Sequence, residues 1–102
     1  MDLAVTVRRD DDVTVALVLR GSLDLASRSH VVDAARTAFA PGTTARVVDL
    51  EGVTFMDSTG LGVLIELAGD ADDDGATFAV ENPSRSVQRL LEISGLAERF
   101  IR

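Results

Sequence analysis

The amino-acid sequence predicts a single α/β domain in which a mixed, mostly parallel β-sheet packs against helices. Its 102 residues are enough for one hydrophobic core and leave little room for a second. Apolar residues switch repeatedly between the period of a strand and the period of a helix. No internal repeat, linker or low-complexity segment divides the chain, so we assign residues 1–102 to one domain.

Two antiparallel strands are predicted at the N-terminal end. Over residues 3–7, apolar side chains alternate with polar or small ones, as on a half-buried strand. The acidic turn at residues 10–12 separates this segment from a second apolar segment at 13–20. Because the connection is short, we expect the two strands to pair antiparallel.

A helix is predicted after the second strand. The segment Gly21-Ser22-Leu23-Asp24 breaks the strand pattern, and Asp24 is a candidate cap for the helix. Pro41-Gly42 ends the helical pattern. The apolar residues that recur at helical spacing between these two points are Val31, Val32, Ala35 and Phe39.

The middle of the chain predicts a strand, a short turn and a second helix. Residues 47–50 form a short apolar strand, and the turn leads from them to Asp57 and Ser58. We expect the helix that follows to pack on the sheet through one apolar face. The residues of that face are Leu61, Leu64, Ile65 and Ala68.

A further strand and a third helix complete the pattern. The strand is predicted over residues 77–80, after an acidic stretch at 70–74, and Asn82-Pro83-Ser84 opens the helix. Gly95 ends that helix. The alternation of strands and helices favours crossovers between parallel strands. A final short turn or helix covers the remaining apolar edge with Leu96, Phe100 and Ile101.

Composition and charge argue against several classes of function. A formal net charge of −7 disfavours binding to nucleic acids or anionic membranes, and four Phe without Trp or Tyr leave no aromatic platform for bases. Without cysteine and with one histidine, the chain lacks thiolate and multi-histidine metal sites. No signal peptide or apolar run of about 18 residues is visible. We therefore expect a soluble, cytoplasmic protein.

Ser58 is the residue that points most directly to function. It is expected at the carboxyl end of a strand, where open α/β sheets place their sites. It is also expected in the first turn of a helix, where backbone N–H groups and the helix dipole tolerate a phosphate. The alternative role is a helix cap, which Ser58 or Asp57 would provide. Three consecutive capping-type residues, Asp57, Ser58 and Thr59, are more than one cap requires.

Catalytic and cofactor motifs do not fit this turn. A nucleophile elbow requires Gly-x-Ser-x-Gly, but Met56 occupies the first glycine position, and the only histidine, His30, precedes the serine. Gly60 and Gly62 lack the third glycine of a dinucleotide loop, and the chain has no lysine for a P-loop. The acidic runs do not match an EF-hand. We expect no enzyme activity, no cofactor and no metal.

Three segments, in this order, carry a resemblance to a known family. They are Gly21-Ser22-Leu23-Asp24, then Asp57-Ser58-Thr59-Gly60-Leu61-Gly62-Val63-Leu64 preceded by Val47-Val48-Asp49-Leu50, and then residues 87–96 with Phe100. In these segments the sequence resembles the anti-sigma factor antagonists, which are single STAS domains. The Asp-Ser-Thr-Gly segment is the specific part, and the resemblance covers essentially the whole chain.

The resemblance implies a STAS-like fold and a protein switch. In this family the unphosphorylated antagonist binds an anti-sigma factor that is also a serine kinase, and it thereby displaces the sigma factor. The kinase then phosphorylates the antagonist with ATP, and a PP2C-type phosphatase resets it. The matching acceptor here is Ser58. The partner-binding residues that the resemblance implies are Ser22, Leu23, Asp24, Asp57, Ser58, Thr59, Gly60 and Leu61.

A second interpretation keeps the fold without the kinase. The chain would then be a non-enzymatic STAS scaffold subunit of a stress-signalling or transporter complex. In that role Ser58 or Thr59 would be only structural. The two interpretations differ in the partner that they require, which is a kinase in the first and a permease or an ATPase in the second.

Overall fold

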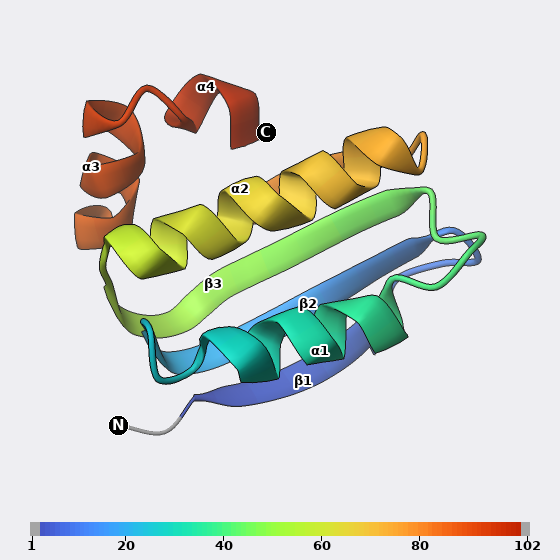
Figure 1. Ribbon diagram of the computed structural model, residues 1–102, viewed down its shortest axis with the longest axis horizontal. Coiled ribbons are helices and arrows are strands. Elements are labelled where there is room, and N and C mark those ends of the chain that lie inside the picture. Colours follow the sequence, from blue (N-terminus) through green and yellow to red (C-terminus); the bar gives the residue numbers. More distant parts are fainter. Residues whose placement is uncertain (1–2, 101–102) are drawn as a thin grey trace.

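The sheet has four strands in the order β1-β2-β3-β4, and the computed structural model describes residues 3–100 (Figure 1). The strands β1 and β2 pair antiparallel, whereas β2 with β3 and β3 with β4 pair parallel. The predicted mixed, mostly parallel α/β class is therefore confirmed. Ile101, expected at the final apolar edge, lies outside the described residues. The elements are β1 (Ala4–Arg9), β2 (Thr14–Leu23), α1 (Arg28–Ala38), β3 (Ala45–Met56), α2 (Ser58–Asp73), β4 (Thr77–Glu81), α3 (Arg85–Ile93) and α4 (Ala97–Phe100).

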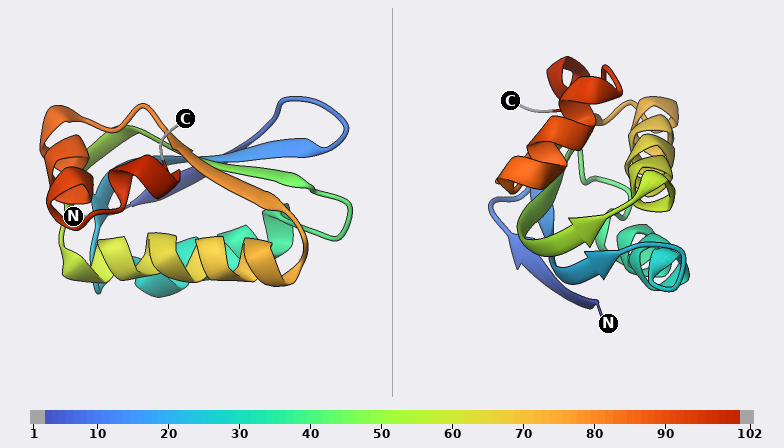
Figure 2. Two further views of the ribbon diagram at one scale, coloured as in Figure 1. Left: turned by 90° about the horizontal axis from the view of Figure 1, so that it is seen from above. Right: turned by 90° about the vertical axis from the view of Figure 1, so that its left-hand side faces the viewer.

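The helices α1 and α2 cover one face of the sheet, and the core lies between the two layers (Figure 2). Side chains alternate along a strand, so β2 sends Val15, Leu17 and Leu19 into this core. The helices meet them with the apolar stripe of α1 and the broader apolar face of α2. The core is aliphatic for the most part, as the composition predicts.

Two strands are longer than the sequence pattern predicts. We expected β2 to end at residue 20 and β3 to end at residue 50, with a turn after it, and both expectations are wrong. Gly21, at φ 111°, lies in a stretch where the register of β2 against β3 shifts, and pairing then resumes as far as Leu23 opposite Met56. Because several residues at 51–56 are exposed, their sequence shows no buried-strand pattern.

The expected cap of the first helix is also wrong. Ser27, not Asp24, occupies the N-cap position of α1, and no side chain caps the helix there. Asp24 instead closes a separate turn, in which its carboxylate accepts the Ser27 N–H at 3.2 Å. The Ser27 hydroxyl donates to the Ser22 carbonyl at 2.8 Å, so this turn is tied to the end of β2.

The second helix differs from expectation in the position of its buried face and in its C-terminal end. Leu64 and Ala68 are buried as predicted, but Ile65 is 44% exposed, because the buried face is centred nearer Val63 and Leu67. The helix also continues through most of the acidic stretch that follows, ending at Asp73. Its C-terminal turn therefore carries carboxylates where the helix dipole is unfavourable to them.

The C-terminal helices pack beside β4. The Ser84 hydroxyl caps α3 by accepting the Val87 N–H at 3.3 Å, and Gly95, at φ 79°, follows the end of that helix. In α4 the buried Phe100 packs edge-to-face on Phe78 of β4, with ring centroids 5.5 Å apart. This contact places α4 beside the outer strand of the sheet.

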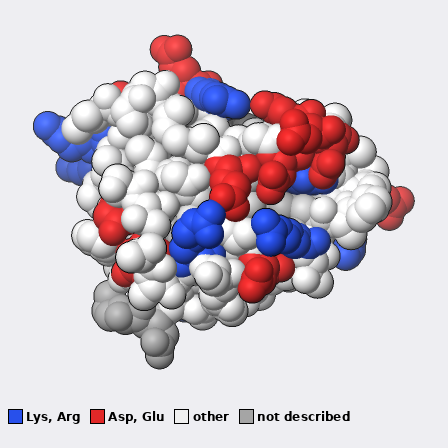
Figure 3. All heavy atoms as spheres, in the orientation of Figure 1, with Lys and Arg blue, Asp and Glu red and all other residues white. Residues whose placement is uncertain are grey.

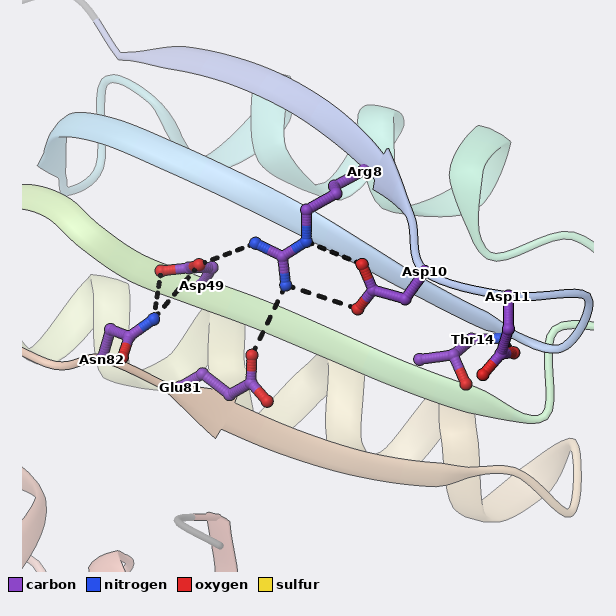
Figure 4. A network of polar contacts seen from close by, with 7 residues as sticks. All are labelled: Arg8, Asp10, Asp11, Thr14, Asp49, Glu81 and Asn82. Carbon is purple, nitrogen blue, oxygen red and sulfur yellow. Dashed lines mark hydrogen bonds and ion pairs between the residues drawn. The ribbon is translucent and has the colours of Figure 1, made fainter.

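The other face of the sheet carries a polar network in place of a helix layer (Figure 4). Its centre is Asp49 of β3, which is 2% exposed. The Asp49 carboxylate accepts hydrogen bonds from Arg8 at 3.0 Å, from the Glu51 N–H at 3.0 Å and from Asn82 at 3.3 Å. Arg8 also pairs with Asp10 at 2.7 Å. The network thus joins β1, β3 and the segment after β4.

The hydrogen bonds to Asp49 outweigh its burial. Burial alone would raise the pKa of this carboxyl, but the bonds from Glu51, Arg8 and Asn82 lower the pKa below the usual value for aspartate. On acidification the unfolded chain therefore takes up a proton at this position before the folded chain does. The stabilisation from Asp49 is full above the unfolded-state pKa of about 4 and is lost as the pH falls below it.

We expect Asp49→Asn to lower the free energy of unfolding by about 1–3 kcal/mol at neutral pH, because Arg8 and the Glu51 N–H lose a buried charged acceptor. Urea denaturation between pH 3 and 7 measures this, and the variant should lose less stability on acidification than the natural chain. Asp12→Asn is the control, since Asp12 is exposed and has no side-chain hydrogen bond within residues 3–100. Equal losses in the two variants would contradict the role of Asp49.

Candidate functional site

The first turn of α2 shows which residue caps the helix. Asp57 occupies the N-cap position with an extended backbone, and its carboxylate accepts the Gly60 N–H at 3.0 Å. The Asp57 carbonyl accepts the Leu61 N–H at 3.0 Å and so begins the helical hydrogen-bond pattern. Of the two candidate caps in the sequence, Asp57 takes the role and Ser58 does not.

Ser58 is the first residue of α2 and is exposed to solvent. Within the described part of the chain its hydroxyl makes no hydrogen bond. It lies where helical N–H groups point outwards without helical acceptors, at the positive end of the helix dipole. Ser58 therefore faces solvent at the end of the helix where a negative charge is favoured.

A close backbone contact holds this turn in place. At Gly60, an added Cβ would overlap the carbonyl oxygen of Leu23 and would lie 2.8 Å from Cγ of Met56. These are closer than ordinary van der Waals contacts, so residue 60 must be glycine for α2 to begin this near the end of β2. The contact joins residues 22–24 to residues 57–61, which are far apart in the sequence.

The sequence-predicted site residues come together but differ in exposure. Three of them, Ser22, Leu23 and Gly60, are buried, so they support the site beneath its surface. Their contact with a partner stays a prediction. Asp24, Asp57, Thr59 and Leu61 are half-buried around the exposed Ser58. The accessible part of the predicted site is therefore Ser58 with the exposed portions of these four residues.

Three large apolar residues near this turn were not predicted as site residues. Leu25 is 73% exposed and directly follows Asp24, and Phe55 is 50% exposed and pairs with Ser22 in the sheet. Ile65 lies on the same solvent-facing side of α2 as Ser58. Exposed apolar side chains beside a polar turn are typical of protein interfaces. Ile65 was expected on the buried face of α2, whereas Leu25 and Phe55 belong to no apolar pattern in the sequence, so no local signal shows that the three are exposed.

The far end of α2 is acidic and does not make a metal site. Figure 3 shows acidic side chains gathered over this end, where Asp70, Asp72, Asp73 and Asp74 lie. Two are paired, Asp74 with Arg46 at 2.8 Å and Asp72 with Arg99 at 3.3 Å. Within residues 3–100, no three acidic, histidine or cysteine side chains gather to hold an ion.

Known proteins resemble this chain over most of its length. Residues 6–102 match the protein-family model described as Mlab, STAS domain. The chain belongs to the STAS family. A STAS-domain containing protein of Pseudomonas aeruginosa (strain UCBPP-PA14) is 31% identical over 91 residues, which cover 88% of each chain. The anti-sigma-B factor antagonist of Bacillus subtilis (strain 168) is 28% identical over 98 residues, which cover 96% of this chain and 88% of that one.

A solved structure agrees with the family assignment. The anti-sigma factor antagonist SpoIIAA in its unphosphorylated form superposes with a TM-score of 0.81 at 25% identity, over 96% of this chain and 86% of that one. The resemblance noted in the sequence is therefore confirmed, and so is the STAS-like fold. No helix within residues 3–100 is long and apolar enough to span a membrane.

We expect Gly60→Ala to destabilise the fold by about 1–3 kcal/mol, because the new methyl group overlaps the Leu23 carbonyl and forces α2 away from β2. Gly62→Ala is a matched control two residues along the helix, where an added Cβ meets nothing within 4 Å. That change should stabilise the helix by about 0.5–1 kcal/mol. Urea denaturation compares the two, and a similar effect of both changes would contradict the close contact.

Proposed function

We propose that this STAS domain is an anti-sigma factor antagonist that binds an anti-sigma serine kinase and is released when the kinase phosphorylates Ser58. A PP2C-type phosphatase would restore the binding form. The observation that carries the proposal is the exposed, unbonded Ser58 hydroxyl at the first position of α2, with Asp57 already serving as the cap. A serine required for the fold would be expected to take that cap itself.

The similarity to antagonists supports the class of function. The Bacillus subtilis relative is named an anti-sigma-B factor antagonist, and the SpoIIAA structure is described as an unphosphorylated form. In this proposal the chain acts as the substrate of another protein's active site. Its only histidine, His30, lies on α1 and lines a groove with β1, so it supplies no base to Ser58.

A charge change at Ser58 is sufficient for release. Phosphorylation adds a charge of about −1.5 to −2 beside Asp57, on a surface that loses water when a partner binds. A cost of about 2.7 kcal/mol weakens binding about a hundredfold. Because the helix N-terminus accommodates a phosphate, the switch needs no refolding of the domain.

The exposed apolar residues suggest how the unphosphorylated form binds. Leu25, which follows Asp24, and Ile65, which lies on the same side of α2 as Ser58, provide exposed apolar area, and Asp24 and Asp57 contribute the charge. An apolar contact with a polar centre is sensitive to one added charge, because that charge must be desolvated with the rest.

A scaffold role in a stress-signalling or transporter complex is the second candidate. It is favoured by the family model, which bears the description Mlab, and by the Pseudomonas aeruginosa relative, which is described only as a STAS-domain containing protein. The same apolar surface would then hold a permanent partner, and the Ser58 hydroxyl would receive no phosphate.

We expect Ser58→Ala to bind the kinase but accept no phosphate, whereas Ser58→Asp should bind at least about tenfold more weakly because it adds a charge at the contact. The kinase is first identified by affinity capture from native cells with and without ATP, and binding is then measured by calorimetry. Ser86→Asp is the matched control, since Ser86 is an exposed serine in the first turn of α3.

Mass spectrometry after incubation with the captured kinase and ATP locates the phosphate. Phosphate at a residue other than Ser58 would refute the assignment of the acceptor. Capture of a permease or an ATPase without a kinase, together with full binding by Ser58→Asp, would favour the scaffold role.

A further inference from the structure

The strand β1 forms an edge of the sheet, and no other helix or strand of residues 3–100 covers it (Figure 1). Among the described strands it pairs with β2 alone, so one side of its backbone has no strand of this part of the chain to bond. The opposite edge differs, since α4 packs beside β4 through Phe100 and Phe78. Proteins commonly protect free edges with charges, proline or bulges, because exposed N–H and C=O groups recruit further strands.

The side chains of β1 leave apolar surface exposed along this edge. On the side facing α1, Val5, Val7 and Arg9 line a groove of about 560 Å³ whose opposite wall includes Asp33 and Thr37. Val7 is 49% exposed, although valine favours a covered strand position. The only charge on this side of β1 lies at its C-terminal end, so the middle of the edge is unprotected.

The order of residues in β1 matches a second copy of itself. If two β1 strands pair antiparallel with Thr6 opposite Thr6, Val5 of each copy lies opposite Val7 of the other. The symmetry thus gives two Val5–Val7 contacts. The arginines also separate, because Arg8 then lies opposite Ala4 of the second copy. A parallel pair would instead place Arg8 and Arg9 beside their own counterparts, which is unfavourable.

Charge across the groove supports the same register. The helix α1 crosses back from β2, which is antiparallel to β1, so α1 and β1 run in the same direction (Figure 1). Arg9 of one copy extends beyond Val5 of the other, towards a groove wall that carries Asp33 at the middle of α1. Within residues 3–100, neither Arg9 nor Asp33 forms an ion pair. Two symmetric Arg9–Asp33 pairs would therefore form between copies.

We propose that the β1 edge is a self-association surface, on which two copies of this chain pair their β1 strands antiparallel about Thr6. The pairing continues the sheet from one copy into the other and closes both grooves. It leaves Ser58 accessible, because Ser58 lies on α2 and α1 stands between α2 and the groove (Figure 2). The proposal is independent of the kinase switch.

A single engineered cysteine tests the register directly, because the chain has none of its own. Opposite Cα atoms in an antiparallel pair lie about 4.5–5.5 Å apart, which is within reach of a disulfide. Thr6→Cys should therefore form a covalent dimer under mild oxidation about tenfold faster than Thr77→Cys. Thr77 is the matched control, as an exposed threonine on the opposite edge strand β4. Non-reducing electrophoresis measures the dimer.

Light scattering over a range of protein concentrations tests the non-covalent dimer. Val7→Lys should raise the dimer dissociation constant about tenfold or more, since it places a charge opposite Val5 of the other copy. Val13→Lys should leave it unchanged, because Val13 is a similarly exposed valine, at 45%, outside β1. Circular dichroism checks that both variants fold. If Val7→Lys does not fold, the cross-linking rates of Thr6→Cys and Thr77→Cys decide whether β1 pairs with β1 of a second copy.

Two results would overturn the proposal. One is a natural chain that stays monomeric at every concentration while Thr6→Cys cross-links no faster than Thr77→Cys. The other is a dimer that survives Val7→Lys unchanged, since another face must then hold the copies together.

Discussion

The contact between Gly60 and the Leu23 carbonyl is the constraint on which the site depends. The first turn of α2 can lie against the end of β2 only because residue 60 has no side chain. That contact requires β2 and β3 to pair as far as Leu23 and Met56, beyond the register shift near Gly21. The register shift between β2 and β3, the length of β3 and one glycine together position Asp57 and Ser58 at the start of α2.

Hydrophobic packing stabilises one face of the sheet, and hydrogen bonds to a buried carboxylate stabilise the other. One face packs aliphatic residues of β2 and β3 beneath α1 and α2, where the hydrophobic effect dominates. The other face surrounds Asp49 with donors from β1, β3 and the segment after β4. Because these donors satisfy the buried carboxylate, the sheet keeps a polar face without a second helix layer.

In the first turn of α2, Asp57 and Ser58 have different roles, since Asp57 is the helix cap and Ser58 is exposed. Asp57 provides the hydrogen bond that the helix start requires, so the neighbouring hydroxyl has no structural duty. A modification of Ser58 therefore changes the surface and leaves the hydrogen bonds of the fold intact. The acidic end of α2 lies at the other end of the helix, where Arg46 and Arg99 partly compensate its charge. Those aspartates are far from Ser58 along the helix, so Asp57 is the carboxylate next to Ser58 in the sequence.

The sequence by itself determined the order of strands and helices, the apolar stripes and the placing of Ser58 where a strand leads into a helix. These features follow from local periodicity, capping residues and helix breakers, which act within a few residues. Only the tertiary structure decided that residues 51–56 continue β3, that Ser27 and not Asp24 begins α1, and that Ile65 faces solvent. It also decided that Asp57 is the cap and that Ser58 is exposed. Those outcomes depend on pairing and packing between segments far apart in the chain, and no local pattern records such contacts.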